Sequence, residues 1–219
     1  MKIISFCLWG NNPKYTVGAI KNAELARQIY PGWRCRFYVA NDVPYSIIMN
    51  LEIFDHVEVV EMNKPGDWTN MFWRFFPAGE EDVEIMISRD TDSRLNIREK
   101  AAVDEWISSD KEFHIMRDHP AHGFPVLGGM WGAKKGTVPN MIELIKSFGC
   151  TNDYGTDYIF FQEKVLPTLN EEQLCVHDEF FAKKPFPIER NGLEFVGQVY
   201  DENGVTVEEH VIALKEALK

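Results

Sequence analysis

The chain has 219 residues, the size of one compact domain, and 45% of them are hydrophobic, so it can bury a full core and is not a disordered or low-complexity protein. Its 23 basic and 34 acidic residues give a net charge of −11. A chain this acidic repels phosphate backbones, which argues against nucleic-acid binding as its main function. No apolar run is long enough to span a membrane, and the first one, residues 3–9, ends too early for a secretory signal. We therefore expect a cytoplasmic protein with no integral membrane segment.

The four cysteines lie far apart and include no Cys-x-x-Cys pair: Cys7, Cys35, Cys150 and Cys175. This spacing lacks the signature of a zinc knuckle or a thioredoxin-type redox motif. We predict free thiols in a reducing compartment rather than a disulfide framework.

The first half of the chain alternates strand and helix patterns. Apolar runs or alternation predict strands at residues 3–8, 34–40, 57–60 and 83–88. Helical spacing predicts helices at 15–30, at the aromatic segment 69–76 and from a capping box at Asn96 and Glu99 to residue 106. Such alternation predicts a mostly parallel sheet covered by helices.

The second half is less regular. We predict a strand at 113–116, helices near 138–148, 156–166 and 206–218, and short apolar runs at 174–176 and 193–196. No internal repeat or linker divides the chain. In open α/β sheets, ligands collect outside the carboxyl ends of the strands. That rule directs attention to the segments at residues 9–10, 40–42 and 89–94.

Asp90-Thr91-Asp92 directly follows the fourth predicted strand. Two carboxylates at positions i and i+2 of an extended chain emerge on the same side, and Mg²⁺ or Mn²⁺ prefers carboxylate oxygens together with substrate phosphates. The pattern indicates a metal that clamps a diphosphate, with Arg89 and Arg94 close enough to contact phosphate oxygens. The simpler alternative is a polar turn in which the aspartates act as caps.

A phosphatase or phosphotransferase of the haloacid-dehalogenase type also carries Asp-x-Asp after a strand, with the first carboxylate as nucleophile. There the motif normally closes the first strand of the domain. Here Asp90 follows several strand and helix patterns. This reading of Asp90 therefore stays a second hypothesis.

Two clusters further along the chain carry histidines and glycines. His119 and His122 lie three residues apart and are either ligands and bases or loop hydrogen-bonding groups. Segment 128–132 has three glycines around Met130 and Trp131. Glycines let the backbone approach a ligand and a tryptophan offers a flat face to a sugar ring, although a tight turn with a core tryptophan explains the segment equally well.

Two carboxylates, one histidine and one arginine complete the set of polar candidates. Asp157 is either a helix cap or a carboxylate that binds a substrate hydroxyl. His177 and Asp178 follow the apolar run 174–176 and are either a metal ligand and base or surface residues. Arg74, among aromatic residues, needs a phosphate or carboxylate partner. The P-loop, dinucleotide-binding, nucleophile-elbow and zincin motifs are absent.

The order of these segments resembles the GT-A glycosyltransferases: an Arg-bearing aromatic segment at 72–75, Asp90-Thr91-Asp92, the glycine segment 128–132 and Gly155-Thr156-Asp157. The resemblance spans residues 3 to about 196 and is greatest to small single-domain transferases of bacteria and chlorella-type viruses. It implies an α/β fold in one domain, residues 1–219. Residues 1–110 would form a Rossmann-like nucleotide-binding half with a mostly parallel sheet, and residues 111–219 the acceptor-side half.

The resemblance also implies an activity: metal-dependent transfer of a hexose from a nucleotide sugar, with UDP-glucose as the first expectation, to a glycan or other hydroxyl acceptor. Carried over by position, the nucleotide-sugar contacts would be Leu8, Trp9, Gly10, Asp42, Arg74, Arg89, Asp90, His119, Gly128, Gly129 and Trp131. The ligands of Mn²⁺ or Mg²⁺ would be Asp90, Asp92 and His177, and the candidate bases Asp157 and Asp178. A non-catalytic nucleotide-sugar-binding module, built on Trp131 and the glycine segment, remains a third hypothesis.

Overall fold

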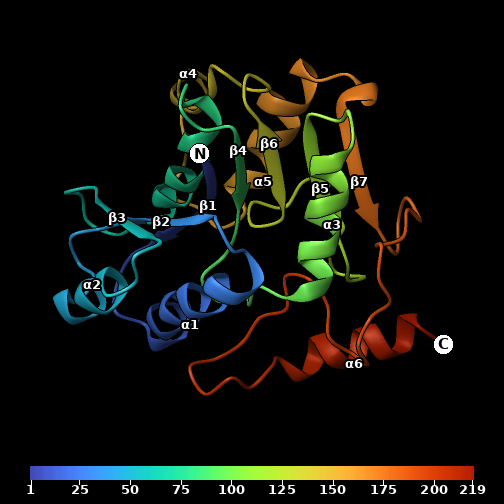
Figure 1. Cartoon of the computed structure of the whole chain (residues 1–219), viewed down its shortest axis with the longest axis horizontal. Coiled ribbons are helices and arrows are strands. Elements are labelled where there is room, and N and C mark those ends of the chain that lie inside the picture. Colours follow the sequence, from blue (N-terminus) through green and yellow to red (C-terminus); the bar gives the residue numbers. More distant parts are fainter.

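The computed structural model describes residues 1–219 as a twisted seven-stranded sheet with helices on both faces (Figure 1). The strand order is β3-β2-β1-β4-β6-β5-β7, and every pair is parallel except those that β6 makes with β4 and β5. The strands are β1 Lys2–Leu8, β2 Arg34–Val39, β3 Val57–Glu61, β4 Ile85–Ser88, β5 Phe113–Arg117, β6 Trp131–Lys134 and β7 Leu174–Asp178. The predicted mostly parallel α/β sheet is confirmed, and β6 makes it a mixed sheet.

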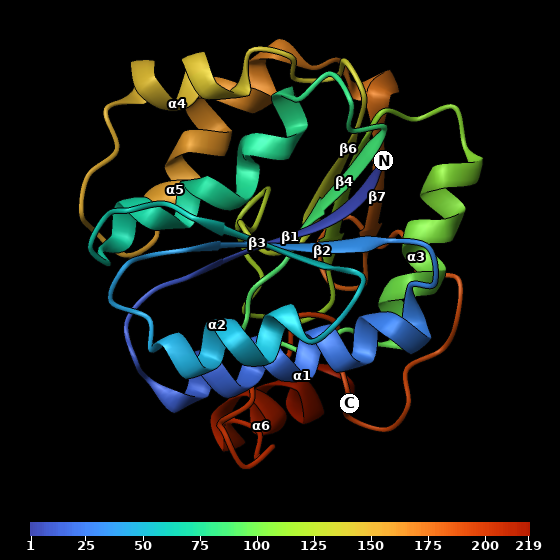
Figure 2. The same cartoon turned by 60° about the vertical axis from the view of Figure 1, so that its left-hand side comes forward.

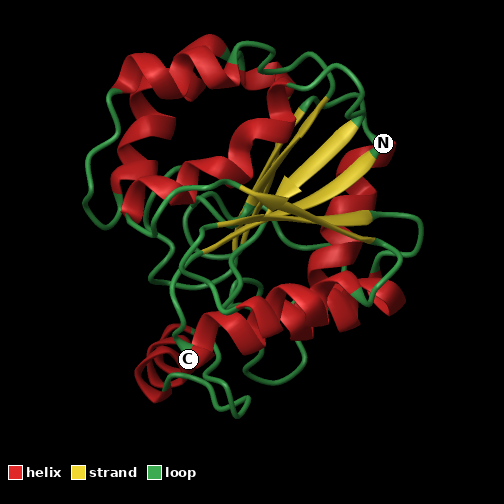
Figure 3. Ribbon diagram, turned by 90° about the vertical axis from the view of Figure 1, so that its left-hand side faces the viewer, coloured by secondary structure: helices red, strands yellow, loops and turns green.

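The helices form one layer on each face of the sheet (Figures 2 and 3). On one face lie α1 Pro13–Ile29, α2 Tyr45–Glu52 and α3 Ile97–Ser108. On the other lie the 3-10 helix η1 Trp68–Gly79, α4 Met141–Phe148 and α5 Thr156–Phe160, which continues as a π turn (Phe161–Val165) and a 3-10 turn (Leu166–Thr168). A short turn at Glu171–Gln173 precedes β7, and α6 Glu208–Ala217 lies below the carboxyl ends of the strands in Figure 1. No helix has both the length and the apolar character that a membrane span requires.

Two apolar cores fill the spaces between the layers because the strands alternate their side chains between the faces. Beneath α1, α2 and α3, Phe6 and Phe37 stack at 4.7 Å between ring centroids. Beneath η1, α4 and α5, Trp131 is fully buried against Phe75 and Phe113. Which core a residue joins therefore tells which face of the sheet its side chain occupies.

Local sequence explains where the helices begin. The Asn12 side chain accepts a hydrogen bond from the Lys14 amide at 3.0 Å, and Pro13 occupies the first turn, so α1 begins before the predicted residue 15. Asn96 caps α3 through the Glu99 amide at 2.8 Å. The Glu99 carboxylate, however, points into the core instead of completing the predicted capping box.

Two elements were not predicted, α2 and β6, and the apolar run at residues 193–196 is irregular chain rather than a strand. Because β6 runs against β5, residues 118–130 cross the carboxyl edge of the sheet between them. A second long connection, residues 179–207, leads from β7 to α6 along the same edge. These two connections form much of the cavity described next.

Candidate active site

A cavity of about 400 Å³ opens at the carboxyl edge of the sheet, where the chain from β1, β4, α5 and both long connections converge. This is the edge at which ligands bind in open α/β sheets. Its lining comprises Cys7, Leu8, Trp9, Tyr15, Trp68, Met71, Arg74, Asp90, Thr91, Asp92, His119, Ala121, His122, Phe124, Leu127, Gly128, Gly129, Met130, Tyr154, Gly155, Asp157, Tyr158, Phe195, Gly197, Val199 and His210.

Asp90 and Asp92 lie side by side at the wall that β4 supplies. The Asp90 side chain is 41% exposed and that of Asp92 is 15% exposed. Burial, together with the negative charge of Asp90, raises the pKa of Asp92 above its usual value. Lys14, at the start of α1, offsets part of this repulsion through an ion pair of 2.8 Å to the Asp92 carboxylate. The cavity thus holds two close carboxylates whose mutual repulsion favours a cation between them.

Arg74 of η1 lies at the base of the cavity and binds two carboxylates at once. Its guanidinium pairs with Asp90 and donates to Asp157 at 3.2 Å, while its Nε has no hydrogen-bond partner. The predicted partner of this arginine, a carboxylate of the Asp90 loop, is present. Burial raises the pKa of Asp157, an effect that the charge of Asp90 reinforces and that of Arg74 opposes. Asp157 therefore binds a proton more readily than an exposed aspartate does.

Gly128 and Gly129 let the chain pass close to these carboxylates. A Cβ atom at Gly128 would lie 2.0 Å from the Asp157 Oδ2, and one at Gly129 would lie 1.9 Å from the Asp90 Oδ2. No side chain fits at either position without moving the acid beside it. The backbone here is held in place because Ser88 donates a 2.6 Å hydrogen bond to the Gly128 carbonyl.

Replacing Gly129 with alanine should displace the Asp90 carboxylate and reduce activity at least tenfold, while the secondary structure stays intact. Gly123→Ala is the matched control, since a Cβ there meets only Phe181, at 4.0 Å. Steady-state kinetics and circular dichroism of both variants measure the effect. Equal activity in the two alanine variants would contradict this account of the glycine.

Aromatic side chains line the rest of the cavity in two groups. Trp68 lies edge-on to Trp9 at 5.8 Å and to Tyr154 at 5.4 Å between ring centroids. Phe124 stacks on Tyr158 at 4.3 Å. Flat, partly exposed rings of this kind bind the faces of nucleobases and sugars. The cavity therefore combines apolar stacking surfaces with a charged floor.

Three histidines meet at the side of the cavity away from Trp9. His119 uses both ring nitrogens: Nδ1 accepts from the Ala121 amide at 3.1 Å and Nε2 donates to the His210 carbonyl at 2.8 Å. The Nδ1 of His122 accepts from the Asp118 amide at 3.1 Å, which leaves its Nε2 without a partner in the chain. The His210 ring makes no hydrogen bond either. His122 and His210 therefore offer free nitrogens to a ligand, and His119 does not.

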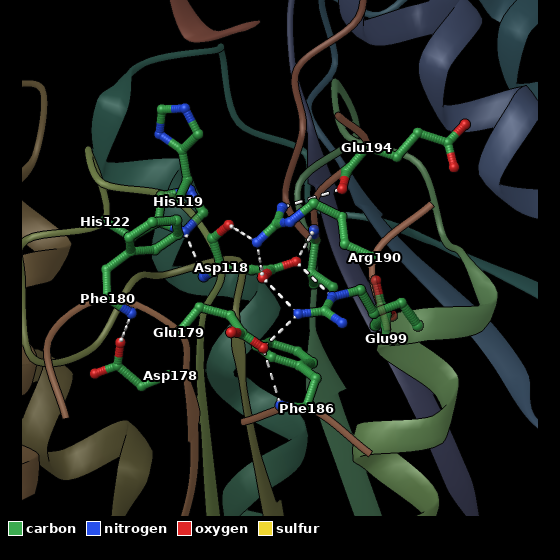
Figure 4. Close-up of polar contacts among 12 residues, drawn as sticks. Glu99, Asp118, His119, His122, Asp178, Glu179, Phe180, Phe186, Arg190 and Glu194 are labelled. Atoms are coloured by element: carbon green, nitrogen blue, oxygen red, sulfur yellow. Dashed lines mark hydrogen bonds and ion pairs between the residues drawn. The ribbon is translucent and has the colours of Figure 1, made fainter. Parts of the chain in front are cut away.

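A buried ion cluster lies beside His119 and His122, as Figure 4 shows. The fully buried Asp118 carboxylate accepts from Arg98 at 3.0 Å, from Arg190 at 2.6 Å and from the Val196 amide at 2.9 Å. The cluster joins α3, the 118–130 connection and the 179–207 connection. Each charge is paired, which a buried carboxylate requires. Asp118 thus anchors the loop that carries His119 and His122.

The pH dependence of stability should reveal the burial of His122. Burial, with the charges of His119 and His210, lowers the pKa of His122 from 6.5 to about 3. Between these values the unfolded chain binds a proton that the folded chain does not, so stability falls as the pH drops below 6.5. His122→Asn should lose less stability than the wild type between pH 7.5 and 4.5, as measured by urea denaturation. The wild-type pH dependence in His122→Asn would refute the argument.

Most of the residues chosen from the sequence gather at this cavity. Nine of them line it: Leu8, Trp9, Arg74, Asp90, Asp92, His119, Gly128, Gly129 and Asp157. Gly10 and Asp42 lie just outside the lining. There the Asp42 carboxylate accepts from the amides of Gly10 at 2.9 Å and Gly66 at 3.1 Å, which holds the loop that carries Trp9.

Arg89 and Trp131 do not belong to the cavity, which corrects the expectation that they contact the donor. Arg89 is 2% exposed and points to the α3 face, where it pairs with Glu99 at 2.8 Å. Trp131 is the centre of the opposite core. Strand alternation explains both results, because Ile87 and Arg89 share one face while the cavity lies beyond the strand end.

His177 and Asp178 are also outside the cavity, so neither the predicted third metal ligand nor the second predicted base is there. His177 faces α3, with its Nδ1 2.8 Å from the Nε2 of His114. Asp178 is fully buried and pairs with Arg117 at 2.6 Å. Although burial opposes it, hydrogen bonds from the amides at residues 180–182 lower the pKa of Asp178, and these bonds occupy its oxygens as a turn cap.

The residues not singled out from the sequence include Tyr15, Phe195 and His210, which line the cavity, and Lys14, which pairs with Asp92. Lys14 and Tyr15 follow the end of β1, so the strand-end rule would have found them. Phe195 and His210 come from the long connection to α6 and from α6 itself, and no local pattern connects them with the cavity.

Comparison with solved structures identifies the architecture. The chain matches the crystal structure of a glycosyltransferase involved in the glycosylation of the major capsid of PBCV-1 with a TM-score of 0.54 and 18% identity, over 83% of each chain. It matches S. aureus TarS 1-349 in complex with UDP-GlcNAc with a TM-score of 0.56 and 12% identity, over 94% of this chain and 62% of that one. This chain has the GT-A fold.

The same fold also occurs in another class of enzyme. The 4-diphosphocytidyl-2C-methyl-D-erythritol synthase from Anaerococcus prevotii matches with a TM-score of 0.54 and 10% identity, over 100% of this chain and 96% of that one. No protein-family model matches the chain, and no curated protein matches it either. The function must therefore be argued from the residues of the cavity in this GT-A chain.

Proposed function

We propose that this GT-A chain is a metal-dependent glycosyltransferase that moves a hexose from a nucleotide sugar to a hydroxyl acceptor. One observation carries the proposal: Asp90 and Asp92 lie together at the carboxyl end of β4, in the cavity that also contains Arg74 and Asp157. Paired carboxylates beside basic groups suit a cation and a diphosphate together.

The residues fit a hard divalent cation such as Mn²⁺ or Mg²⁺. Burial and the neighbouring Asp90 charge raise the pKa of Asp92, a cost that a cation between the two carboxylates would remove. Asp90 and Asp92 would hold the ion. The ring of His210, which makes no hydrogen bond, is the remaining candidate for a third ligand in place of the predicted His177; His122 accepts a backbone hydrogen bond at Nδ1, so its Nε2 carries the proton and can donate to a diphosphate oxygen.

The aromatic group around Trp68 suits the base of the donor. Trp9, Trp68 and Tyr154 line the mouth of the cavity on the β1 side, and Lys14 is a partly exposed cation next to Asp92 that suits a diphosphate. We propose a UDP-sugar, with UDP-glucose as the first donor to test. The TarS structure, which shares the fold, is a complex with UDP-GlcNAc, and this supports the choice of nucleotide.

The side chains of this cavity would share the work of the transfer. A bound divalent ion would supply Lewis-acid stabilisation of the negative charge on the leaving diphosphate. Arg74 orients Asp90 and Asp157 through its two ion pairs. Asp157, whose pKa burial raises, would accept the proton of an acceptor hydroxyl as it attacks the anomeric carbon. A donor bound against the aromatic lining would exclude water and strengthen these charge interactions.

The proposal is tested by measuring the melting temperature with a panel of nucleotide sugars, with and without Mn²⁺, and then release of the free nucleotide. We expect one nucleotide sugar to raise the melting temperature only when Mn²⁺ is present, and slow release of its nucleotide diphosphate. Binding without turnover in the presence of diverse acceptors would favour a non-catalytic binding module. Aspartyl-phosphate trapped at Asp90 would favour the phosphatase hypothesis.

A second candidate is a nucleotidyltransferase. It is favoured by the match to a diphosphocytidyl-forming synthase over nearly the whole of both chains. Pyrophosphate release from a nucleoside triphosphate and a sugar or polyol phosphate, without turnover of any nucleotide sugar, would support this candidate and overturn the transferase.

A further inference from the structure

A second group of side chains of the types that bind metals lies on the face of the sheet that α3 covers, opposite η1, α4 and α5. His114 of β5 and Cys175 and His177 of β7 offer one nitrogen, one sulfur and one nitrogen, all within 4.8 Å of one another. Their positions follow from the register, since His114 is paired with Cys175 and residues 175 and 177 of a strand share a face. Helix α3 covers this face beside β5 and β7 (Figure 1).

We propose that His114, Cys175 and His177 bind a zinc ion, and that the carboxylate of Glu105 in α3 binds the second ring nitrogen of His177. Imidazole and thiolate ligands select Zn²⁺ over Mg²⁺ and Mn²⁺, which prefer oxygen. The site is therefore chemically distinct from Asp90 and Asp92. One chain would hold a hard cation in the cavity and a softer one on the opposite face.

The contact with Glu105 orients His177 for this role, and zinc would replace the hydrogen bond between the two rings. The Nδ1 of His177 faces the Nε2 of His114 at 2.8 Å, and the Nε2 of His177 faces the Glu105 carboxylate at 3.3 Å. A carboxylate that binds the second nitrogen of a histidine is the usual outer partner of a zinc ligand, because it fixes the tautomer that binds the metal. His114 is held by Trp106, whose ring stacks on it at 5.1 Å and 15°.

The protonation and spacing of the three ligands also suit zinc. Burial, with the charges of His177 and Arg89, keeps the pKa of His114 well below 6.5, and burial lowers the pKa of His177 although Glu105 opposes it, which favours the neutral rings that metal binding requires. Tetrahedral zinc places nitrogen and sulfur ligands about 3.3–3.6 Å apart, given bonds of about 2.0–2.3 Å. The two ring nitrogens, 2.8 Å apart, would separate by about half an ångström to admit the ion, and the Cys175 sulfur, which lies within 4.8 Å of them, would move to about 3.6 Å.

The charge and access of the site are favourable as well. A dication with one thiolate and the Glu105 carboxylate gives a neutral group, which suits a location where His114 is fully buried. Burial raises the pKa of Cys175 to about 11, and zinc binding would release that proton. Glu105 is 59% exposed and Cys175 is partly exposed, so the ion has a route from solvent.

The bound ion would fasten the edge strand β7 to α3 and β5. That strand leads directly into residues 179–207, which bring Phe195 to the cavity and then α6 with His210. Zinc would thus stabilise the C-terminal part of the chain without contacting a substrate.

The test uses the full chain after removal of metals by a chelator. Titration with Zn²⁺ should give one tight site, and Co²⁺ should give a cobalt–thiolate charge-transfer band in the near ultraviolet. Both should be lost, with zinc affinity at least 100-fold weaker, in Cys175→Ser and in His177→Gln. Cys150→Ser, which changes a partly exposed thiol elsewhere, should retain the band.

The Asp92→Asn variant distinguishes this site from the cavity. It should bind Zn²⁺ and Co²⁺ at the site that includes Cys175 as the wild type does. Circular dichroism identifies any variant that fails to fold. Zinc affinity unchanged in folded Cys175→Ser and His177→Gln, or lost in Asp92→Asn, would overturn the proposal. A wild-type chain that binds no Zn²⁺ would overturn it as well.

Discussion

Asp92→Asn should lower the rate of sugar transfer by about 10²–10³-fold, the usual effect of removing one group that stabilises charge in a transition state. The amide keeps the shape of the carboxylate but binds a divalent cation poorly, so the dependence of the rate on Mn²⁺ should also shift to higher concentration. The fold should survive, because burial and Asp90 make the ionised Asp92 unfavourable in the folded state. The rate of nucleotide release across a Mn²⁺ titration measures this effect.

Asp110→Asn is the matched control for that experiment. Its carboxylate is 86% exposed and pairs only with Lys111, on the surface away from the cavity. The control should retain the wild-type rate and the wild-type response to Mn²⁺. An Asp92→Asn variant that behaves like this control would show that the cavity carboxylates are not the metal ligands, and the proposed transferase mechanism would be wrong.

Arg74→Met should destabilise the chain by about 3–5 kcal/mol, because it leaves the Asp90 and Asp157 carboxylates without their buried partner. The same change should abolish transfer, since the orientation of both acids is lost. Urea denaturation at pH 7.5 measures the first effect, and nucleotide release the second.

The cost of Arg74→Met should also depend on pH. Without the guanidinium the pKa of Asp157, already raised by burial, rises further in the folded state. The folded variant then binds a proton more readily than the unfolded chain does, so its deficit relative to the wild type should shrink as the pH falls from 8 to 5.

Arg36→Met is the matched control for Arg74→Met. Arg36 also bridges two carboxylates, Glu58 and Glu80, but both are partly exposed, at 36% and 29%, and lie away from the cavity, whereas the Asp157 partner of Arg74 is only 6% exposed. Solvent offsets the lost charge there, so the variant should be destabilised less and should keep its activity. Equal losses in the two arginine variants would refute the argument from burial.

The sequence predicted the parts of the fold that have a strong local signal. The apolar runs of β1 and β4 and the cap at Asn96 mark their elements within a few residues, whereas the Asn12 cap that begins α1 was not recognised. Strand β6 was missed because its four residues, Trp131 to Lys134, include a glycine and show no alternation. Helix α2 was missed because its start at Pro44 has no side-chain cap.

The residues of the candidate site that were predicted correctly also have a local signal in the sequence. Asp90 and Asp92 were found because they directly follow a predicted strand. Arg74 was found because an arginine among aromatic residues needs a charged partner. For Arg89 and His177, the sequence places each residue near a strand end but does not tell which face of the sheet the side chain takes. His210 reaches the cavity only through the tertiary path of residues 179–207, which no local pattern encodes.

The reversed direction of β6 has a consequence for how the specificity of this scaffold can change. Residues 118–130 leave the sheet at β5 and return to it at β6, so both ends of this connection are held by hydrogen-bonded strands. Insertions or substitutions in the middle of this connection, around Gly123, would change the shape of the cavity entrance, while the carboxylates that follow β4 keep their positions. In the proposed transferase, changes in this connection would therefore alter which molecules reach the carboxylates without changing the sheet.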